Sequence, residues 1–168
     1  MLINMRKNKQ YFVGVYWKAR MATAEESAKS IYEILIELQA VSQVFNFWLE
    51  KVSENPDSAP EIKIEQSVVL TLIQDYFENN KHGYSFSAWN KERATISCLL
   101  GATSSYISNC FLVEFPCVSE TLAIEEMNKI MSILRIKLNP DYGYANALEK
   151  LEIDHQNYPI GLFKIVSS

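Results

Sequence analysis

The sequence has few of the residues that most catalytic and cofactor sites need. It holds 2 histidines, 3 cysteines and 5 glycines among its 168 residues. Neither His82 nor His155 has a second ligand at the spacing of a metal-binding motif, and no C-x-x-C pair is present. No G-x-G-x-x-G or G-x-x-x-x-G-K phosphate loop occurs. These absences argue against a metal site, a nucleotide-binding enzyme and any bound cofactor.

Long apolar runs are also missing, so we expect no membrane-spanning segment. The first ten residues, MLINMRKNKQ, have cationic side chains but lack the apolar stretch of a secretory signal. The three cysteines form an odd set without paired spacing, which is typical of reduced, buried thiols. These features predict a cytoplasmic protein.

The negative charge is concentrated in one part of the chain. Residues 1–21 carry five cations and no acid, residues 22–80 carry eleven acids and three lysines, and residues 81–168 carry nine acids and eight bases. A surface of this sign repels nucleic acid and attracts basic proteins. The plainer explanation is that these acids solvate the polar faces of two amphipathic helices.

Stacking of nucleic-acid bases on sheet aromatics is disfavoured for a related reason. Phe86 and Trp89 lie on a predicted strand, but only Lys91 and Arg93 stand nearby on a chain whose net charge is −4. Base-stacking surfaces need flanking cations for the phosphates. We therefore expect no nucleic acid among the partners.

The hydrophobic pattern predicts a single α+β domain, an antiparallel β-sheet with packed α-helices. Residues 1–9 are expected to form a flexible lead to this domain, which accounts for all of residues 1–168. The predicted strands are 11–17, 84–89, 95–100, 110–115 and 161–166, with Pro116 ending the fourth. The predicted helices run from the capping box of Thr23 and Glu26 to about Val52, over 62–77 and over 122–138. Residues 144–148 read as a short strand or an irregular stretch.

The order of motifs along the chain resembles one protein family. The motifs are V-G-V-Y-W-K-A-R followed by T-A-E-E-S-A, then S-A-W-N, T-I-S-C-L-L-G-A, N-C-F-L-V-E-F-P and N-P-D-Y-G. The residues that carry the resemblance are Gly14, Tyr16, Trp17, Arg20, Glu25, Glu26, Trp89, Asn90, Cys98, Gly101, Asn109, Pro116, Pro140 and Asp141. Together they resemble the immunity protein 52 family of bacterial polymorphic-toxin systems over about residues 10–165.

This resemblance implies a cognate inhibitor that binds a toxin domain and neutralises it stoichiometrically, without catalysis, metal or cofactor. Members are associated with nuclease toxins of the restriction-endonuclease-like class, often linked to type VI secretion or Rhs-type carriers. An acidic surface suits that role, because a nuclease needs a basic surface for phosphates. The resemblance does not set the oligomeric state.

We predict that the contact surface combines the acids of the first helix, the acidic loop after it, and two turns. A tryptophan at the end of a strand, beside a charged turn, is a frequent interface hot spot. We interpret Trp17 and Arg20 as architectural, since they lie at a strand-to-helix joint. The predicted contact residues are Glu33, Glu37, Asp57, Glu61, Trp89, Asn90, Arg93, Asp141 and Tyr142.

Two other functions remain open at this point. A secretion adaptor or chaperone would also be acidic and non-catalytic. A small hydrolase would use Cys98 as its nucleophile with a distant histidine, although a mid-strand cysteine is more often a buried thiol.

Overall fold

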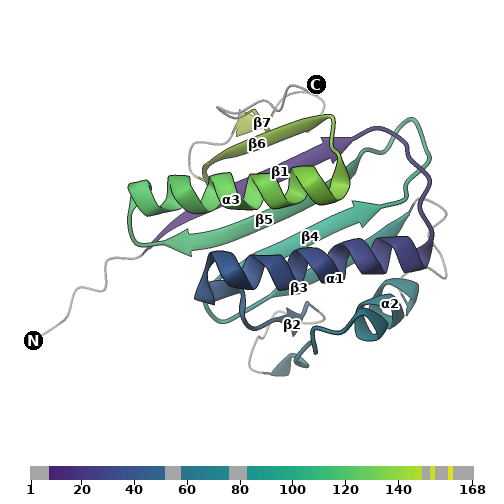
Figure 1. Ribbon diagram of the computed structural model, residues 1–168, viewed down its shortest axis with the longest axis horizontal. Helices are drawn as coiled ribbons and strands as arrows, with labels where there is room; N and C mark the ends of the chain where they lie inside the picture. The colour runs from purple at the N-terminus through teal and green to yellow at the C-terminus, as the bar shows by residue number, and fades with distance from the viewer. Residues whose placement is uncertain (1–7, 52–57, 76–82, 149–151, 154–158, 161–168) are drawn as a thin grey trace, which may run out of the picture.

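A computed structural model describes residues 8–51, 58–75, 83–148, 152–153 and 159–160. It shows three helices packed on a six-stranded antiparallel sheet, which confirms the predicted single α+β domain (Figure 1). The sheet order is β2-β3-β4-β5-β1-β6, and β7 pairs with β8 in a separate two-stranded sheet. The strands are β1 (Lys9–Trp17), β2 (Leu49–Glu50), β3 (Tyr84–Trp89), β4 (Thr95–Leu100), β5 (Asn109–Cys117), β6 (Tyr142–Ala147), β7 (Glu152–Ile153) and β8 (Pro159–Ile160). The helices are α1 (Ala24–Val41), α2 (Gln66–Asp75) and α3 (Glu120–Leu138), with a short 3₁₀ helix, η1 (Gln43–Phe45).

The first strand of the chain lies inside the sheet, between β5 and β6. Alternate residues point to opposite faces of a strand, and Val13 and Val15 point into the main core, which they share with buried residues of α1 and α3. Phe12 and Tyr16 on the other face are also buried. The strand is therefore covered on both faces. β1 begins at Lys9, two residues before its predicted start.

The helix α1 begins at the predicted capping box. The backbone N–H of Glu26 donates to Oγ1 of Thr23 at 3.1 Å, and the N–H of Thr23 donates to Oε2 of Glu26 at 2.8 Å. The predicted end near Val52 was wrong, because α1 ends at Val41. Ser42 is extended, and its hydroxyl accepts the N–H of Val44, so the side chain competes with the helix backbone at this point.

The apolar spacing that suggested a longer helix has another cause. Phe45, Trp48 and Leu49 are all buried, but they reach the core from η1 and β2 rather than from a helix. Similarly, α2 begins at Gln66 rather than residue 62, since the N–H of Ile62 donates to the carbonyl of Trp48 and holds that residue beside β2.

The prediction that Pro116 ends its strand was also wrong, because β5 continues to Cys117. The pairing of β4 with β5 stops at Glu114, so Pro116 has a strand partner only on the β1 side, at Gln10. A proline lacks the N–H that a central strand needs, but it is tolerated where one side of the strand is unpaired.

The remaining boundaries are close to prediction. β3 and β4 have the predicted bounds, and α3 starts two residues earlier, at Glu120, where Ser119 caps it. Asn139 ends α3 in a left-handed conformation, with a φ of 45°. Residues 142–147 form β6, a full strand of the sheet, so the strand interpretation of that segment is confirmed. The strand predicted at 161–166 lies outside the described residues.

Candidate functional site

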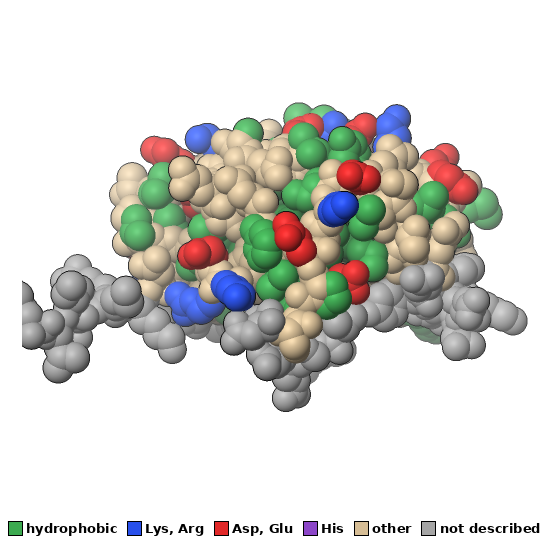
Figure 2. Space-filling view, turned by 90° about the horizontal axis from the view of Figure 1, so that it is seen from below, with side chains coloured by type: hydrophobic (Ala, Val, Ile, Leu, Met, Phe, Trp, Pro, Cys, Tyr) green, Lys and Arg blue, Asp and Glu red, His purple; other side chains and the backbone are tan. Residues whose placement is uncertain are grey.

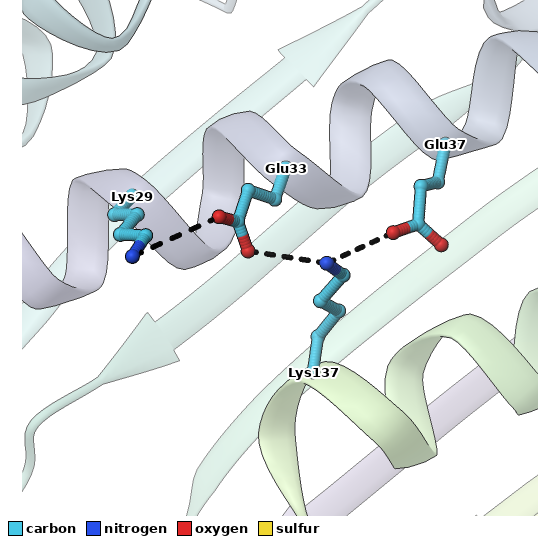
Figure 3. Close-up of polar contacts among 4 residues, drawn as sticks. All are labelled: Lys29, Glu33, Glu37 and Lys137. Atoms are coloured by element: carbon cyan, nitrogen blue, oxygen red, sulfur yellow. Dashed lines mark hydrogen bonds and ion pairs between the residues drawn. The ribbon is translucent and has the colours of Figure 1, made fainter.

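Two of the predicted contact acids lie on α1 at the boundary with α3. Nζ of Lys137, on α3, lies 3.2 Å from Oε2 of Glu33 and 2.9 Å from Oε1 of Glu37 (Figure 3). Lys29 approaches Glu33 from the same helix, with 4.0 Å between its Nζ and Oε1. The hydrogen bonds to Glu37 and Glu33 raise the pKa of Lys137 above its usual value. These four side chains therefore carry two positive and two negative charges, and no net charge.

This arrangement gives Glu33 and Glu37 a role inside the molecule. They lie on the flank of the helix that faces α3, where they join the two helices through one lysine. Their oxygens are still partly exposed, with relative side-chain accessibilities of 35% for Glu33 and 42% for Glu37. That Glu33 and Glu37 contact a partner stays a prediction. Lys29 and Lys137 already offset much of their negative charge within the molecule.

Replacing Lys137 by methionine tests this ion pair. We expect a small decrease of the melting temperature at low salt, because the carboxylates of Glu33 and Glu37, neighbours along α1, then lack the cation between them. The decrease should shrink at about 1 M salt, where the Debye length is about 3 Å. Arg135→Met is the matched control, since Arg135 is exposed, lies in the same last turn of α3 and has no ion-pair partner within the described ranges. An equal decrease for both variants at both salt concentrations would contradict the ion-pair role.

The turn between β3 and β4 contains three more of the predicted contact residues. Asn90 is 6% exposed, and its Nδ2 donates to the carbonyls of Val44 at 2.7 Å and Phe47 at 3.1 Å. Its Oδ1 accepts the N–H of Ala94 at 3.1 Å. The side chain of Asn90 therefore joins this turn to the segment that follows α1, which is a structural role.

The neighbours of Asn90 are placed differently. Trp89 is half-buried at the end of β3, paired with Thr95. Arg93 is exposed and has a positive φ of 66°, and its Nη2 donates to the carbonyl of Asn8 at 2.9 Å. The turn is thus bonded to the start of β1 and presents Trp89 and Arg93 at its surface.

Asp141 and Tyr142 lie at the other end of the sheet. Oδ2 of Asp141 accepts the N–H of Lys18, and the N–H of Asp141 donates to the carbonyl of Tyr16, both at 2.9 Å. Tyr142 begins β6 opposite Tyr16 and is 40% exposed. Asp141 therefore fixes the end of β1 to the start of β6. Those predicted contact residues that the structure describes therefore lie at separate places on the fold.

The joint between β1 and α1 is architectural, as predicted. Nη1 and Nη2 of Arg20 donate to the carbonyls of Leu138 at 2.7 Å and Asn139 at 2.9 Å, at the C-terminal end of α3. The same guanidinium lies over the ring of Trp17, 5.8 Å from its centroid. Carbonyls at the end of a helix lack helical partners, so Arg20 satisfies two of them.

A second set of acids lies on the flank formed by β2 and α2. Glu61 is exposed and continues the pairing at β2 through its bridge to Leu49, while Asp57, the other acid predicted in this loop, lies outside the described residues. Glu50, Glu61 and Glu65 have no ion-pair partner in the part of the chain that the structure describes. Figure 2, seen from this side, shows acidic side chains mixed with basic and hydrophobic ones. Lys51 and Lys63 also lie here, so the described flank has three acids against two lysines and is weakly acidic, whereas Glu33 and Glu37 on α1 are paired with Lys137.

The described residues do not favour a catalytic thiol. Cys98 lies in β4 with 6% exposure, and burial, followed by the neighbouring Cys110, raises its pKa well above the usual value. A protonated, enclosed thiol is a poor nucleophile. Both histidines lie outside the described residues. Within these residues, no group of three His, Cys, Asp or Glu side chains is placed to hold a metal ion.

The helices of the described fold give no sign of membrane insertion. None of them combines the length and the apolar character that crossing a bilayer requires.

Asn109 is the residue whose role the sequence did not indicate. It is fully buried, and its Oδ1 accepts the N–H of Ala102 at 2.8 Å. Its Nδ2 donates to the carbonyls of Ala102 and Lys18, both at 3.0 Å. Asn109 thus joins the loop between β4 and β5 to the end of β1. Its place in the N-C-F-L-V-E-F-P motif, at the end of a polar turn, marks it in the sequence but does not reveal a buried amide that joins two loops.

Comparison with known proteins identifies a matching family and a solved structure with a similar fold. A sequence model described as Immunity protein 52 matches residues 9–159. A solved structure, Pseudomonas aeruginosa T6SS protein PA0821, has a similar fold at 11% identity and a TM-score of 0.52. The similarity covers 82% of this chain and 40% of that one, so this chain spans about two fifths of that protein's length. The search of curated proteins finds no match.

Proposed function

The chain belongs to the immunity protein 52 family, and on that premise we propose that it binds a cognate toxin domain one-to-one and neutralises it in the cytoplasm. The family match carries this proposal, since residues 9–159 include all six strands of the main sheet and all three α-helices. An immunity protein acts by binding, so the chain is not an enzyme. The enclosed thiol of Cys98 agrees with this conclusion.

The proposed toxin is a nuclease with a basic surface. The support is electrostatic: the chain has a net charge of −4, and Glu50, Glu61 and Glu65 lie without ion-pair partners on the described β2–α2 flank. An acidic surface attracts the cationic surface that a nuclease uses for phosphates, and it accelerates the encounter between the two proteins. We propose that this flank steers the toxin.

Co-expression tests the function itself. We expect this chain to restore growth to cells that express, inside the cell, the toxin domain encoded beside its gene. A secretion adaptor would affect only delivery, so it would not protect against a toxin that is already inside. Continued growth arrest, with both proteins present at comparable levels, would refute the proposal.

A charge-reversal set tests the steering surface. The triple variant Glu50→Lys, Glu61→Lys, Glu65→Lys should lower the association rate constant for the toxin domain by roughly tenfold or more at low salt, since steering acts mainly on association. The matched control is Glu92→Lys, Glu120→Lys, Glu125→Lys, because these three exposed acids lie outside the flank and are not among the predicted contact residues. Stopped-flow association at two salt concentrations gives the rates. Equal effects of the two sets would contradict the assignment of steering to the β2–α2 flank.

A further inference from the structure

Two large apolar side chains project from loops at one end of the sheet. Tyr106 is 96% exposed and Met21 is 83% exposed, which makes them the most exposed large hydrophobic residues in the described ranges. Met21 lies between β1 and α1, and Tyr106 lies between β4 and β5. The N–H of Arg20 donates to the carbonyl of Ala102 at 3.0 Å, so the two loops run side by side (Figure 1).

Single exposed hydrophobic residues are common on protein surfaces, and what distinguishes these two is how firmly their loops are held. Asn109 is fully buried and bonds both loops, through Ala102 on one and Lys18 on the other. Gly101 has a φ of 73°, a conformation that favours glycine. The hydroxyl of Ser104 accepts the N–H of Tyr106 at 3.2 Å, which forms the tip of the longer loop. The backbone on both sides of each exposed side chain is thus fixed before any partner arrives.

Several charged groups around these loops are bonded within the molecule. The guanidinium of Arg20 donates to the last carbonyls of α3, the carboxylate of Asp141 accepts the N–H of Lys18, and Glu26 belongs to the capping box of α1. These groups hold the loops in place, and the exposed side chains beside them include the ring of Tyr106, the thioether of Met21 and the charged groups of Lys18 and Glu25. A partner that fits this end of the sheet therefore presents an apolar pocket with polar groups at its rim.

We propose that Tyr106 and Met21 are the apolar anchors of the toxin contact and enter a hydrophobic pocket of the toxin domain. The proposal rests on the proposed function, since it locates part of the surface on which toxin binding takes place. Tyrosine is enriched among residues that dominate binding energy. A side chain on a fixed backbone loses less conformational entropy when it binds. The acids of the β2–α2 flank then govern association, and these anchors govern dissociation.

The test measures dissociation of the purified toxin domain encoded beside this gene from four variants. Tyr106→Ala should raise the dissociation constant roughly 30-fold, chiefly through faster dissociation, as a hot-spot residue does. Met21→Ser should raise it by a smaller factor, and Tyr106→Phe should keep nearly wild-type binding because the ring remains. Val118→Ser is the control, since Val118 is 75% exposed but follows β5 at the opposite end of the sheet.

The melting temperature should be unchanged in all four variants, because each replaced side chain contributes little to the core. If the wild-type chain binds the toxin domain and Tyr106→Ala dissociates at the wild-type rate, the anchors are refuted and the proposed function stands. An equal rise of the dissociation constant for Val118→Ser would also refute the anchor role of Tyr106 and Met21. If the wild-type chain does not bind the toxin domain at all, the proposed function itself fails.

Discussion

Replacing Asn109 by alanine should lower the free energy of unfolding by about 3–5 kcal/mol, a large effect for one polar side chain. The asparagine is fully buried and makes three hydrogen bonds to backbone groups of Ala102 and Lys18. Alanine would leave the N–H of Ala102 and the carbonyl of Lys18 without that partner, while the carbonyl of Ala102 would keep the N–H of Arg20. Each buried polar group left unsatisfied costs about 1–3 kcal/mol. Urea unfolding of the two proteins measures the difference.

The control for this prediction is Asn128→Ala. Asn128 lies on α3 with an exposed side chain, so its replacement should change the free energy of unfolding by no more than about 0.5 kcal/mol. A loss below about 1 kcal/mol for Asn109→Ala would mean that water or a local shift replaces its bonds. That result would also weaken the case that the Met21 and Tyr106 loops are fixed before binding.

Asn90→Ala should lower the free energy of unfolding by about 2–4 kcal/mol, although the sequence placed Asn90 in the toxin contact. Its side chain makes three hydrogen bonds, to Val44, Phe47 and Ala94, and is 6% exposed. The loss should appear in urea unfolding, while the affinity of the folded fraction for the toxin domain stays unchanged. Reduced affinity without reduced stability would instead make Asn90 a contact residue.

The neighbouring Arg93→Ala variant gives the matched comparison for Asn90. The side chain of Arg93 is exposed and makes one hydrogen bond, to the carbonyl of Asn8, so its loss should cost less stability than that of Asn90. If the two variants were equally destabilised, the turn as a whole, rather than the buried amide of Asn90, would be the stabilising feature.

The parts of the fold that depend on local chemistry could be predicted. The capping box at Thr23 and Glu26 and the bounds of β3 and β4 follow from residues a few positions apart. The end of α3 follows from Asn139 and the proline after it. In each case a side chain or a turn residue determines the backbone without help from the rest of the chain.

The errors come from interactions between distant parts of the chain. The end of α1 was misplaced because Phe45 and Trp48 keep an apolar spacing that the tertiary fold uses for η1 and β2. The acids Glu33 and Glu37 were read as free charge, yet Lys137, 104 residues from Glu33 in the sequence, lies between them. Helical spacing shows that two side chains share a face but does not show which other helix lies against that face.

The exposed anchors were missed for a related reason. Met21 and Tyr106 are ordinary apolar residues in the sequence, and only their exposures of 83% and 96% in the folded chain set them apart. Most family-motif residues of these loops, including Arg20, Gly101 and Asn109, instead make internal contacts. The family motif therefore marks residues that hold these loops in place. The side chains that the loops expose to solvent are found only in the structure.

The position of β1 between β5 and β6 has a consequence for how the protein is made. Among the described strands β1 is made before both strands that pair with it, since Cys110 and Tyr142, the partners of Tyr16, lie 94 and 126 residues later. The apolar residues of β1 can therefore be covered only after most of the chain has been synthesised. Topologies dominated by such distant pairings fold slowly. A nascent chain of this kind can pair β1 with β5 first, and it completes the pairings of β1 only once β6 is available.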